Sequence, residues 1–309
     1  MSNGSRRGPG RPPIPGRCGE GVSAVARLLP DGRRLHLQHG PIDLVIEAWG
    51  EAAEVAAAYD QVRGAFGEVL PTLCGELARL RAPVDACGFA GPVAERMRRA
   101  CLPHAARGFI TPMAAVAGAV ADHMLERMTA GRRLARCYVN DGGDIAFHLA
   151  PGAQLSCGLV SDLTRPALDG GFTLRHDLPA RGIATSGRAT RGSGGRSFSL
   201  GIADAVTVLA ACAADADAAA TVIANAVDLP GHPQITRTPA SSIDPDSDLG
   251  DIPVTIGLGE LEIAEIRTAL ARGVAVAEDL RRAGRIVAAV LVLRGAFAGA
   301  GLDAGRIAA

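Results

Sequence analysis

Strand-like patterns follow one another through the middle of the chain without a helical pattern between them. Apolar alternation predicts strands at 135–139 and 145–149, a pair of strands between 155 and 174, and a further strand at 182–185. A doubly wound fold would need a helix between successive strands. The order of patterns therefore favours an α+β fold with a mixed or antiparallel sheet and packed helices.

Other parts of the chain divide between strand and helix signals. Residues 24–50 read as two or three strands, interrupted by Asp31-Gly32 and Gly40-Pro41. Apolar residues at helical spacing predict helices over 51–80, with a break at Pro71, and also over 92–101, 109–131, 214–227 and 261–283. The glycines and alanines of the 109–131 helix permit close approach by another backbone or by a flat ligand. Strands are predicted at 205–211 and 285–297.

The two ends of the chain carry no apolar run. Residues 1–16 combine arginines with prolines, which predicts a disordered tail and neither a signal peptide nor a lipoprotein leader. We place one folded domain at 17–298 and a flexible C-terminal tail at 299–309. The seven cysteines include no Cys-x-x-Cys pair, and we interpret all of them as reduced thiols. These features predict a cytoplasmic protein.

The basic residues are all arginines. The 309 residues include 32 basic and 32 acidic side chains and not one lysine, so the formal net charge is zero. Zero net charge argues against a nucleic-acid or membrane-surface partner. The lack of lysine excludes Schiff-base catalysis, a Walker-type P-loop and Ser-x-x-Lys acyl transfer.

Two glycine-containing segments are candidate ligand-binding turns. In "VNDGGD", Gly142 and Gly143 supply positive φ, while Asn140 and Asp144 can either lock a tight turn or bond a ligand. In "GIATSGR", Ala184, Thr185, Ser186, Gly187 and Arg188 could cradle phosphate oxygens, with Arg191 and Arg196 as further donors. The alternative for the second segment is a mobile surface loop.

Two groups of oxygen-bearing side chains are candidate cation sites. Asp217, Thr221 and Asn225 are spaced by four and so share one helical face, where they could hold Mg²⁺ or could simply support the helix. The acidic stretch 244–251 begins like a calcium loop, but Leu249 replaces the required glycine, so we reject an EF-hand. A solvated loop and a loop over a ligand pocket both stay open. The seven histidines show no metalloprotease spacing.

The order of these motifs resembles the ApbE-like superfamily, which includes the FAD:protein FMN transferases. "AVAGAVAD", residues 115–122, is similar to the family's Gly-Ala-Lys-Gly helix start, with Ala117 in place of the lysine. "VNDGGDI" matches its Asn-x-Gly-Gly-Asp turn, "GIATSG" its Ala-Thr-Ser-Gly strand end, and "AVTVLAACAADADAAAT" its Val-Thr-Val strand with Ala-Asp-x-x-x-Thr. The similarity spans about 108–228, and "SFSLGIADAVTV" suggests the cytoplasmic branch without the transferase histidine segment.

The resemblance implies specific roles. It implies an ApbE-like fold of two lobes in one domain, Mg²⁺ ligands at Asp217 and Thr221, and a pocket for FAD or FMN. The residues implied to line or shape that pocket are Asn140, Gly142, Gly143, Asp144, Ala184, Thr185, Ser186, Gly187 and Arg188.

The expected function is binding of a flavin nucleotide, or a related phosphate-bearing heterocycle, with Mg²⁺-assisted phosphoryl or FMN transfer as the chemistry it could serve. Because the histidine segment is absent, the sequence leaves open whether the protein is an enzyme. One alternative is an enzyme of pterin or other one-carbon cofactor biosynthesis, and another is a non-catalytic oligomeric binding protein. The expected partner is a small nucleotide-like molecule, and a homodimer is compatible with the sequence.

Overall fold

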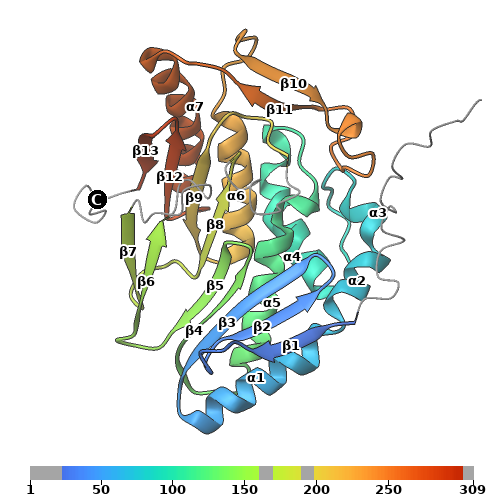
Figure 1. Ribbon diagram of the computed structural model, residues 1–309, viewed down its shortest axis with the longest axis vertical. Helices are drawn as coiled ribbons and strands as arrows, with labels where there is room; N and C mark the ends of the chain where they lie inside the picture. Colours follow the sequence, from blue (N-terminus) through green and yellow to red (C-terminus); the bar gives the residue numbers. More distant parts are fainter. Residues whose placement is uncertain (1–22, 160–169, 189–197, 302–309) are drawn as a thin grey trace, which may run out of the picture.

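A nine-stranded antiparallel sheet forms the centre of the computed structural model, which describes residues 23–159, 170–188 and 198–301 (Figure 1). Its strand order is β1-β2-β3-β4-β5-β8-β9-β12-β13. Strands β6 and β7 form one separate hairpin, and β10 and β11 form another. Every strand pair in the described residues is antiparallel, which confirms the predicted α+β class.

The elements alternate irregularly along the chain. The strands are β1 (Val25–Leu28), β2 (Leu35–His39), β3 (Ile42–Gly50), β4 (Leu134–Asp141), β5 (Asp144–Leu149), β6 (Gln154–Leu159), β7 (Gly170–Arg175), β8 (Gly182–Ser186), β9 (Ala205–Ala210), β10 (Ile235–Pro239), β11 (Pro253–Leu258), β12 (Ala288–Leu293) and β13 (Ala296–Ala300). The α-helices are α1 (Ala52–Phe66), α2 (Val69–Gly75), α3 (Leu77–Leu80), α4 (Pro92–Cys101), α5 (Val116–Thr129), α6 (Ala213–Ala226) and α7 (Ile263–Arg282). Short 3₁₀ helices cover Leu102–Arg107, Pro112–Ala115 and Ala240–Ser242.

Three local expectations need correction. The 51–80 segment breaks at residues 67–68 and again at Glu76, and Pro71 lies in the first turn of α2, where its missing N–H is not needed. The 285–297 segment is a hairpin rather than one strand, because Arg294 and Gly295 turn the chain with φ of 51° and 74°. Strand β13 continues to the buried Ala300, two residues beyond the expected domain end.

The β10–β11 hairpin was not predicted from the sequence. Pro239 and Pro253 lie opposite each other in it, and the register shifts between Thr236 and Arg237. Prolines and a bulge hide the alternating pattern that identifies a strand. By contrast, the predicted pair between 155 and 174 is confirmed, with Leu155 directly opposite Leu174.

Helices cover one face of the sheet, with α4, α5 and α6 packed together (Figure 1). Under this layer one core cluster joins β2–β5 to α1, α4 and α5, and a second joins β8, β9 and β12 to α6 and α7. The two clusters share one sheet, in agreement with two lobes in one domain. The opposite face carries a smaller cluster with β6 and β7.

The cysteines differ from the expectation in one case. Cys87, Cys101, Cys137, Cys157 and Cys212 are free, whereas Cys74 is disulfide-bonded. The interpretation of every cysteine as a reduced thiol is therefore wrong for Cys74.

Within the described ranges, no single helix has both the length and the apolar character needed to cross a membrane. One pair, Pro92–Arg107 and Pro112–Thr129, meets those two criteria only when taken together, and it is bent by 119°.

Candidate functional site

The glycine pair forms the two-residue turn of the β4–β5 hairpin. Asp141 lies opposite Asp144, and Gly142 and Gly143 have φ of 63° and 113°, which glycine adopts without strain. Asn140 closes the turn, since its Oδ1 accepts a hydrogen bond from the Gly143 N–H at 2.8 Å. Asn140 and the glycines thus shape the turn and hold two aspartates at its ends.

Asp144 faces the helical layer. Side chains alternate along a strand, and Ala146 belongs to the core cluster under the helices while Phe147 belongs to the cluster on the other face. The Asp144 Oδ1 accepts a hydrogen bond from the Thr185 N–H at 3.1 Å. Burial raises the pKa of Asp144 to about 7, and the bond from Thr185 acts against that shift.

The β8 segment contributes mainly its backbone. Ala184 is fully buried in the core, and Thr185 shares the face of Ile183, away from the helices. The Thr185 hydroxyl lies 2.9 Å from the Thr207 hydroxyl. At these two positions of the predicted phosphate cradle, the group that reaches the site is therefore the Thr185 backbone N–H, which donates to the Asp144 carboxylate.

The end of β8 turns away at Gly187. A Cβ at Gly187, whose φ is 148°, would overlap the Asp204 carbonyl, so only glycine fits. Ser186, opposite Val206 in β9, is partly buried. The Arg188 N–H donates to the Ala203 carbonyl at 2.9 Å. Burial lowers the pKa of the Arg188 guanidinium, with attraction from Asp204 and repulsion from Arg294 as smaller effects. The predicted donors Arg191 and Arg196 lie outside the described residues.

Asp217 meets Asp144 from the helical side. The Asp217 Oδ2 accepts a hydrogen bond from the Gly118 N–H at 3.1 Å. Burial raises the pKa of Asp217 well above its usual range, and repulsion from Asp144, Asp141 and Asp122 raises it further. The structure thus brings together the turn aspartate and the helix aspartate, which are more than 70 residues apart in the sequence.

The close approach of α5 to α6 explains this meeting. A Cβ at Gly118 would overlap the carbonyl of Ala213, so the two backbones touch at this point. Asp122 of α5 accepts hydrogen bonds from the N–H groups of Ala213 and Ala214 at 3.0 and 2.9 Å, at the start of α6. Sequence reasoning missed Asp122, although an acid within an apolar helix is the signal that could have revealed it.

A cavity of about 480 Å³ lies along the Thr221 face of α6. Most of its wall is apolar, and the wall also includes Thr221 and Asn225 of α6. Asp217 is one helical turn from Thr221, and it accepts its hydrogen bond from Gly118, two residues after Val116 in the cavity wall. The main lining residues are Pro41, Ile42, Leu70, Leu73, Leu77, Leu80, Arg81, Met97, Phe109, Ile110, Thr111, Met113, Ala114, Val116, Phe198, Leu200, Thr221 and Asn225.

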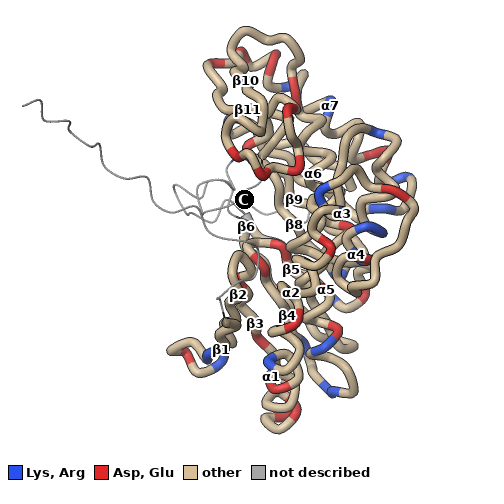
Figure 2. Tube along the Cα trace, turned by 90° about the vertical axis from the view of Figure 1, so that its right-hand side faces the viewer, with Lys and Arg blue, Asp and Glu red and all other residues tan. Residues whose placement is uncertain are grey.

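The acidic loop between β10 and β11 borders the same cavity. Figure 2 shows acidic positions gathered beside β11, and Asp244, Asp246 and Asp248 line the opening. The Thr111 hydroxyl donates a hydrogen bond to Asp248, which ties the loop to the segment before α5. Of the two readings left open by the sequence, the structure supports a loop over a pocket.

The donor set fits a magnesium ion that keeps waters and ligand oxygens. Among residues 23–159, 170–188 and 198–301, no group of three or more His, Cys, Asp or Glu side chains could hold a metal. Asp144 and Asp217 each have one oxygen bonded by a backbone N–H, through Asp144 Oδ1 and Asp217 Oδ2, so Asp144 Oδ2 and Asp217 Oδ1 are the oxygens that a cation could use. Mg²⁺ is commonly bound through one or two carboxylates together with ligand phosphates, rather than by a closed protein cage.

Comparison with protein families gives the decisive match. The family model described as AbpE bacteria matches residues 26–299. The chain belongs to this family. The match confirms the ApbE-like resemblance and extends it from the motif region to nearly the whole described chain.

The curated relatives match a smaller part of the chain than the family model does. The UPF0280 protein of Methanothermobacter thermautotrophicus is 37% identical over 141 residues, which are 45% of this chain and 50% of that protein. The UPF0280 protein of Methanocaldococcus jannaschii is 37% identical over 119 residues, 38% of this chain and 45% of that protein. The chain therefore spans about half the length of the curated relatives it matches.

Solved structures of low identity are also similar. The ApbE protein of Thermotoga maritima has a TM-score of 0.47 at 11% identity, covering 90% of this chain and 96% of that one. The apo flavinyl transferase ApbE of Pseudomonas stutzeri has a TM-score of 0.47 at 13% identity, covering 90% and 93%.

Proposed function

We propose that this protein binds a flavin nucleotide, FAD or FMN, or a related phosphate-bearing heterocycle, with Mg²⁺ at Asp217 and Thr221. One observation carries the proposal: two carboxylates, Asp144 and Asp217, repel each other, and Asp217 lies one helical turn from Thr221 in the wall of a cavity of about 480 Å³. A dication between a carboxylate and a phosphate would relieve that repulsion. Membership of the family supports flavin as the ligand, because the ApbE-like transferases take FAD.

The two parts of the cavity suit the two parts of such a ligand. A ring system suits the apolar wall, to which Phe109, Met113 and Leu77 contribute. Phosphates suit the edge at Asp217 only with a cation present, because the nearby carboxylates would otherwise repel them. When bound, Mg²⁺ would neutralise phosphate charge and so favour phosphoryl transfer.

The backbone bonds to the carboxylates would position them. The Thr185 and Gly118 N–H groups each fix one oxygen, so the other oxygen of Asp144 and of Asp217 is held in place before a ligand arrives. Such pre-organisation lowers the cost of ordering the site on binding.

The proposal is tested by calorimetry on the full chain with FAD and FMN, with and without Mg²⁺. We expect binding that Mg²⁺ strengthens, and we expect Asp217→Ala to weaken the Mg²⁺-dependent part at least about tenfold. Asp60→Ala is the matched control, because Asp60 lies on α1 with 75% of its side chain exposed.

The outcomes separate the alternatives. Release of AMP from FAD would add cleavage of the pyrophosphate to binding, with free FMN as the product if water is the acceptor and FMN attached to an added acceptor protein if the reaction is transfer. No binding of FAD or FMN would overturn the proposal, and binding of a pterin instead would favour an enzyme of one-carbon cofactor metabolism. Full Mg²⁺ dependence in Asp217→Ala would refute the metal assignment alone.

A further inference from the structure

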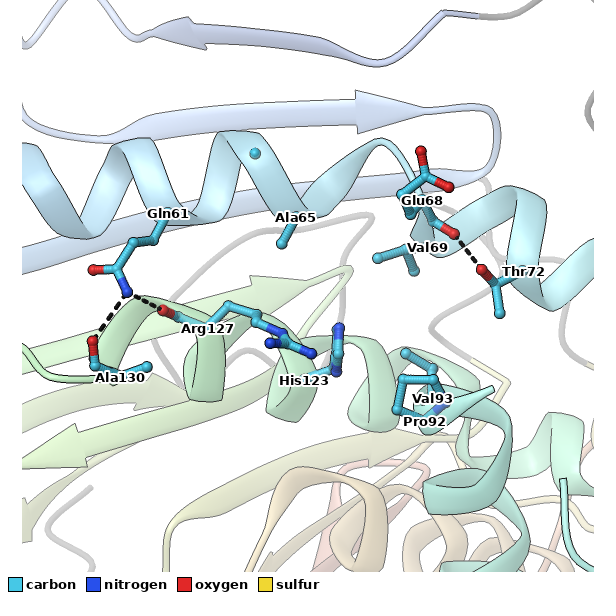
Figure 3. A pocket seen from close by; sticks show the side chains of 11 residues that line it. Gln61, Ala65, Glu68, Val69, Thr72, Pro92, Val93, His123, Arg127 and Ala130 are labelled. Carbon is cyan, nitrogen blue, oxygen red and sulfur yellow. Dashed lines mark hydrogen bonds between the residues drawn. The ribbon is translucent and has the colours of Figure 1, made fainter. Parts of the chain in front are cut away.

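A second hollow lies on the other side of α5 from the candidate site. It is a groove of about 580 Å³ between α1 and α2 on one side and α4 and α5 on the other (Figure 3). No residue lines both this groove and the cavity described above. The lining residues are Gln61, Gly64, Ala65, Glu68, Val69, Thr72, Pro92, Val93, His123, Arg127 and Ala130.

A buried histidine points into this groove. His123 is only 6% exposed, and Figure 3 shows its ring directed from α5 into the space facing α1 and α2. Its ring nitrogens neither donate a hydrogen bond to, nor accept one from, any part of the chain that the structure describes. The ring nitrogens are not among the buried atoms without a partner, so they are open to the groove, where a ligand can reach them.

The Arg127 side chain, a cation, lies next to His123. The Arg127 guanidinium reaches along α5 toward His123 (Figure 3), and it forms no ion pair with a carboxylate in the described ranges. Its neighbour Glu126 pairs instead with Arg96, at 2.9 Å. Burial lowers the pKa of His123, the charges of Arg127 and Arg96 lower it further, and the charge of Glu126 opposes that shift. The groove therefore presents positive charge and a neutral imidazole.

The remaining wall determines the size and polarity of a ligand. Glu68 lines the groove, but Figure 3 shows its carboxylate directed away from His123. Ala65, Val69, Pro92 and Val93 present apolar surface around the His123 ring. The polar pair thus lies at the base of an otherwise mostly apolar groove.

We infer that this groove binds a small molecule that carries a carboxylate or phosphate on a compact apolar body. The oxyanion lies between the Arg127 guanidinium, which can donate two parallel hydrogen bonds, and the His123 ring, which can donate one. The apolar body packs against Val69 and Val93. This site is separate from the proposed flavin site and stands whether or not flavin binds.

The test is a titration of the full chain, with histidine rings labelled for NMR, using benzoate in one arm and inorganic phosphate in the other. We expect saturable shifts of the His123 ring signals, which His123→Gln assigns, whereas equal additions of sodium chloride leave them unchanged. Tighter binding of benzoate would identify the ligand as an organic acid, and tighter binding of phosphate would identify it as a phosphate compound.

Two arginine variants complete the test. Arg127→Gln should weaken binding at least about tenfold, since it removes a charge-assisted bidentate donor. Arg282→Gln, on α7 with 70% of its side chain exposed, should leave binding unchanged. Absence of a saturable shift with both probes would overturn the inference, as would equal binding by Arg127→Gln and the wild type.

Discussion

Two aspartates perform matching tasks where α5 crosses α6. Asp122 of α5 accepts N–H groups from the first turn of α6, and Asp217 of α6 accepts an N–H from the first turn of α5. Each carboxylate therefore interacts favourably with the positive end of the other helix. In this respect the two sites are equivalent.

The two carboxylates differ in how many of their oxygens already accept a hydrogen bond. Asp122 uses both oxygens, and each accepts an N–H that would otherwise be buried without a partner. Asp217 uses one oxygen and has Asp144 and Asp141 as repelling neighbours. The satisfied carboxylate supports the fold, whereas the partly satisfied one is suited to a ligand.

The largest effect is expected for Asp122→Ala. Two buried N–H groups of α6 would lose their acceptor, so the free energy of unfolding should fall by about 3 kcal/mol. Urea denaturation measures this change. Because Asp60 is exposed, Asp60→Ala should change stability by less than about 0.5 kcal/mol. If Asp122→Ala leaves the free energy of unfolding unchanged, Asp122 does not have this structural role.

A smaller loss, about 2 kcal/mol, is expected for Gly118→Ala. The added Cβ would overlap the Ala213 carbonyl, and the helices would have to separate. Gly64→Ala on α1 is the control, since no atom lies within 4 Å of its added Cβ, and it should be neutral or stabilising. Equal stability of the two variants would show that the helices do not pack as closely as the structure indicates.

Local patterns predicted most of the fold. The α4 boundaries matched because Pro92 begins that helix, and the β6–β7 pair matched because Leu155 and Leu174 are each flanked by alternation. The β10–β11 hairpin failed because prolines and a bulge disguise it. The position of a helix break depends on which face packs against the sheet, and Pro71 alone does not reveal that.

The site was predictable only in part. The order of motifs selected Asp144 and Asp217, which the fold brings together. It could not show that the Thr185 hydroxyl faces away from the helices, because that depends on strand pairing with β9. Nor could it reveal the role of Asp122 or the groove at His123, because both depend on contacts between segments distant in the sequence.

Asp217→Asn should change the free energy of unfolding in the opposite direction to Asp122→Ala. Removing one of two repelling charges should stabilise the protein without added ligand by roughly 1 kcal/mol at pH 8. The gain should shrink as the pH falls, because burial and the repulsion from Asp144 raise the pKa of the wild-type carboxyl and favour its neutral form. The same variant should lose Mg²⁺-dependent stabilisation, as thermal unfolding with and without Mg²⁺ will show. Destabilisation by Asp217→Asn at pH 8 would place Asp217 with Asp122 as a structural residue.

The smallest effect is expected for Asp144→Asn, because asparagine keeps an oxygen that can accept the Thr185 N–H. Burial raises the pKa of Asp144 to about 7, so the folded state favours the protonated form. This contribution is complete below the unfolded pKa near 4 and is lost as the pH rises through about 7. Asp144→Asn should therefore match the wild type in free energy of unfolding at pH 4 and exceed it at pH 8. With saturating Mg²⁺ the order at pH 8 should reverse, because the ion binds only the ionised carboxylate. If Mg²⁺ stabilises the wild type and Asp144→Asn equally, Asp144 is not a ligand, and the metal site contains Asp217 without it.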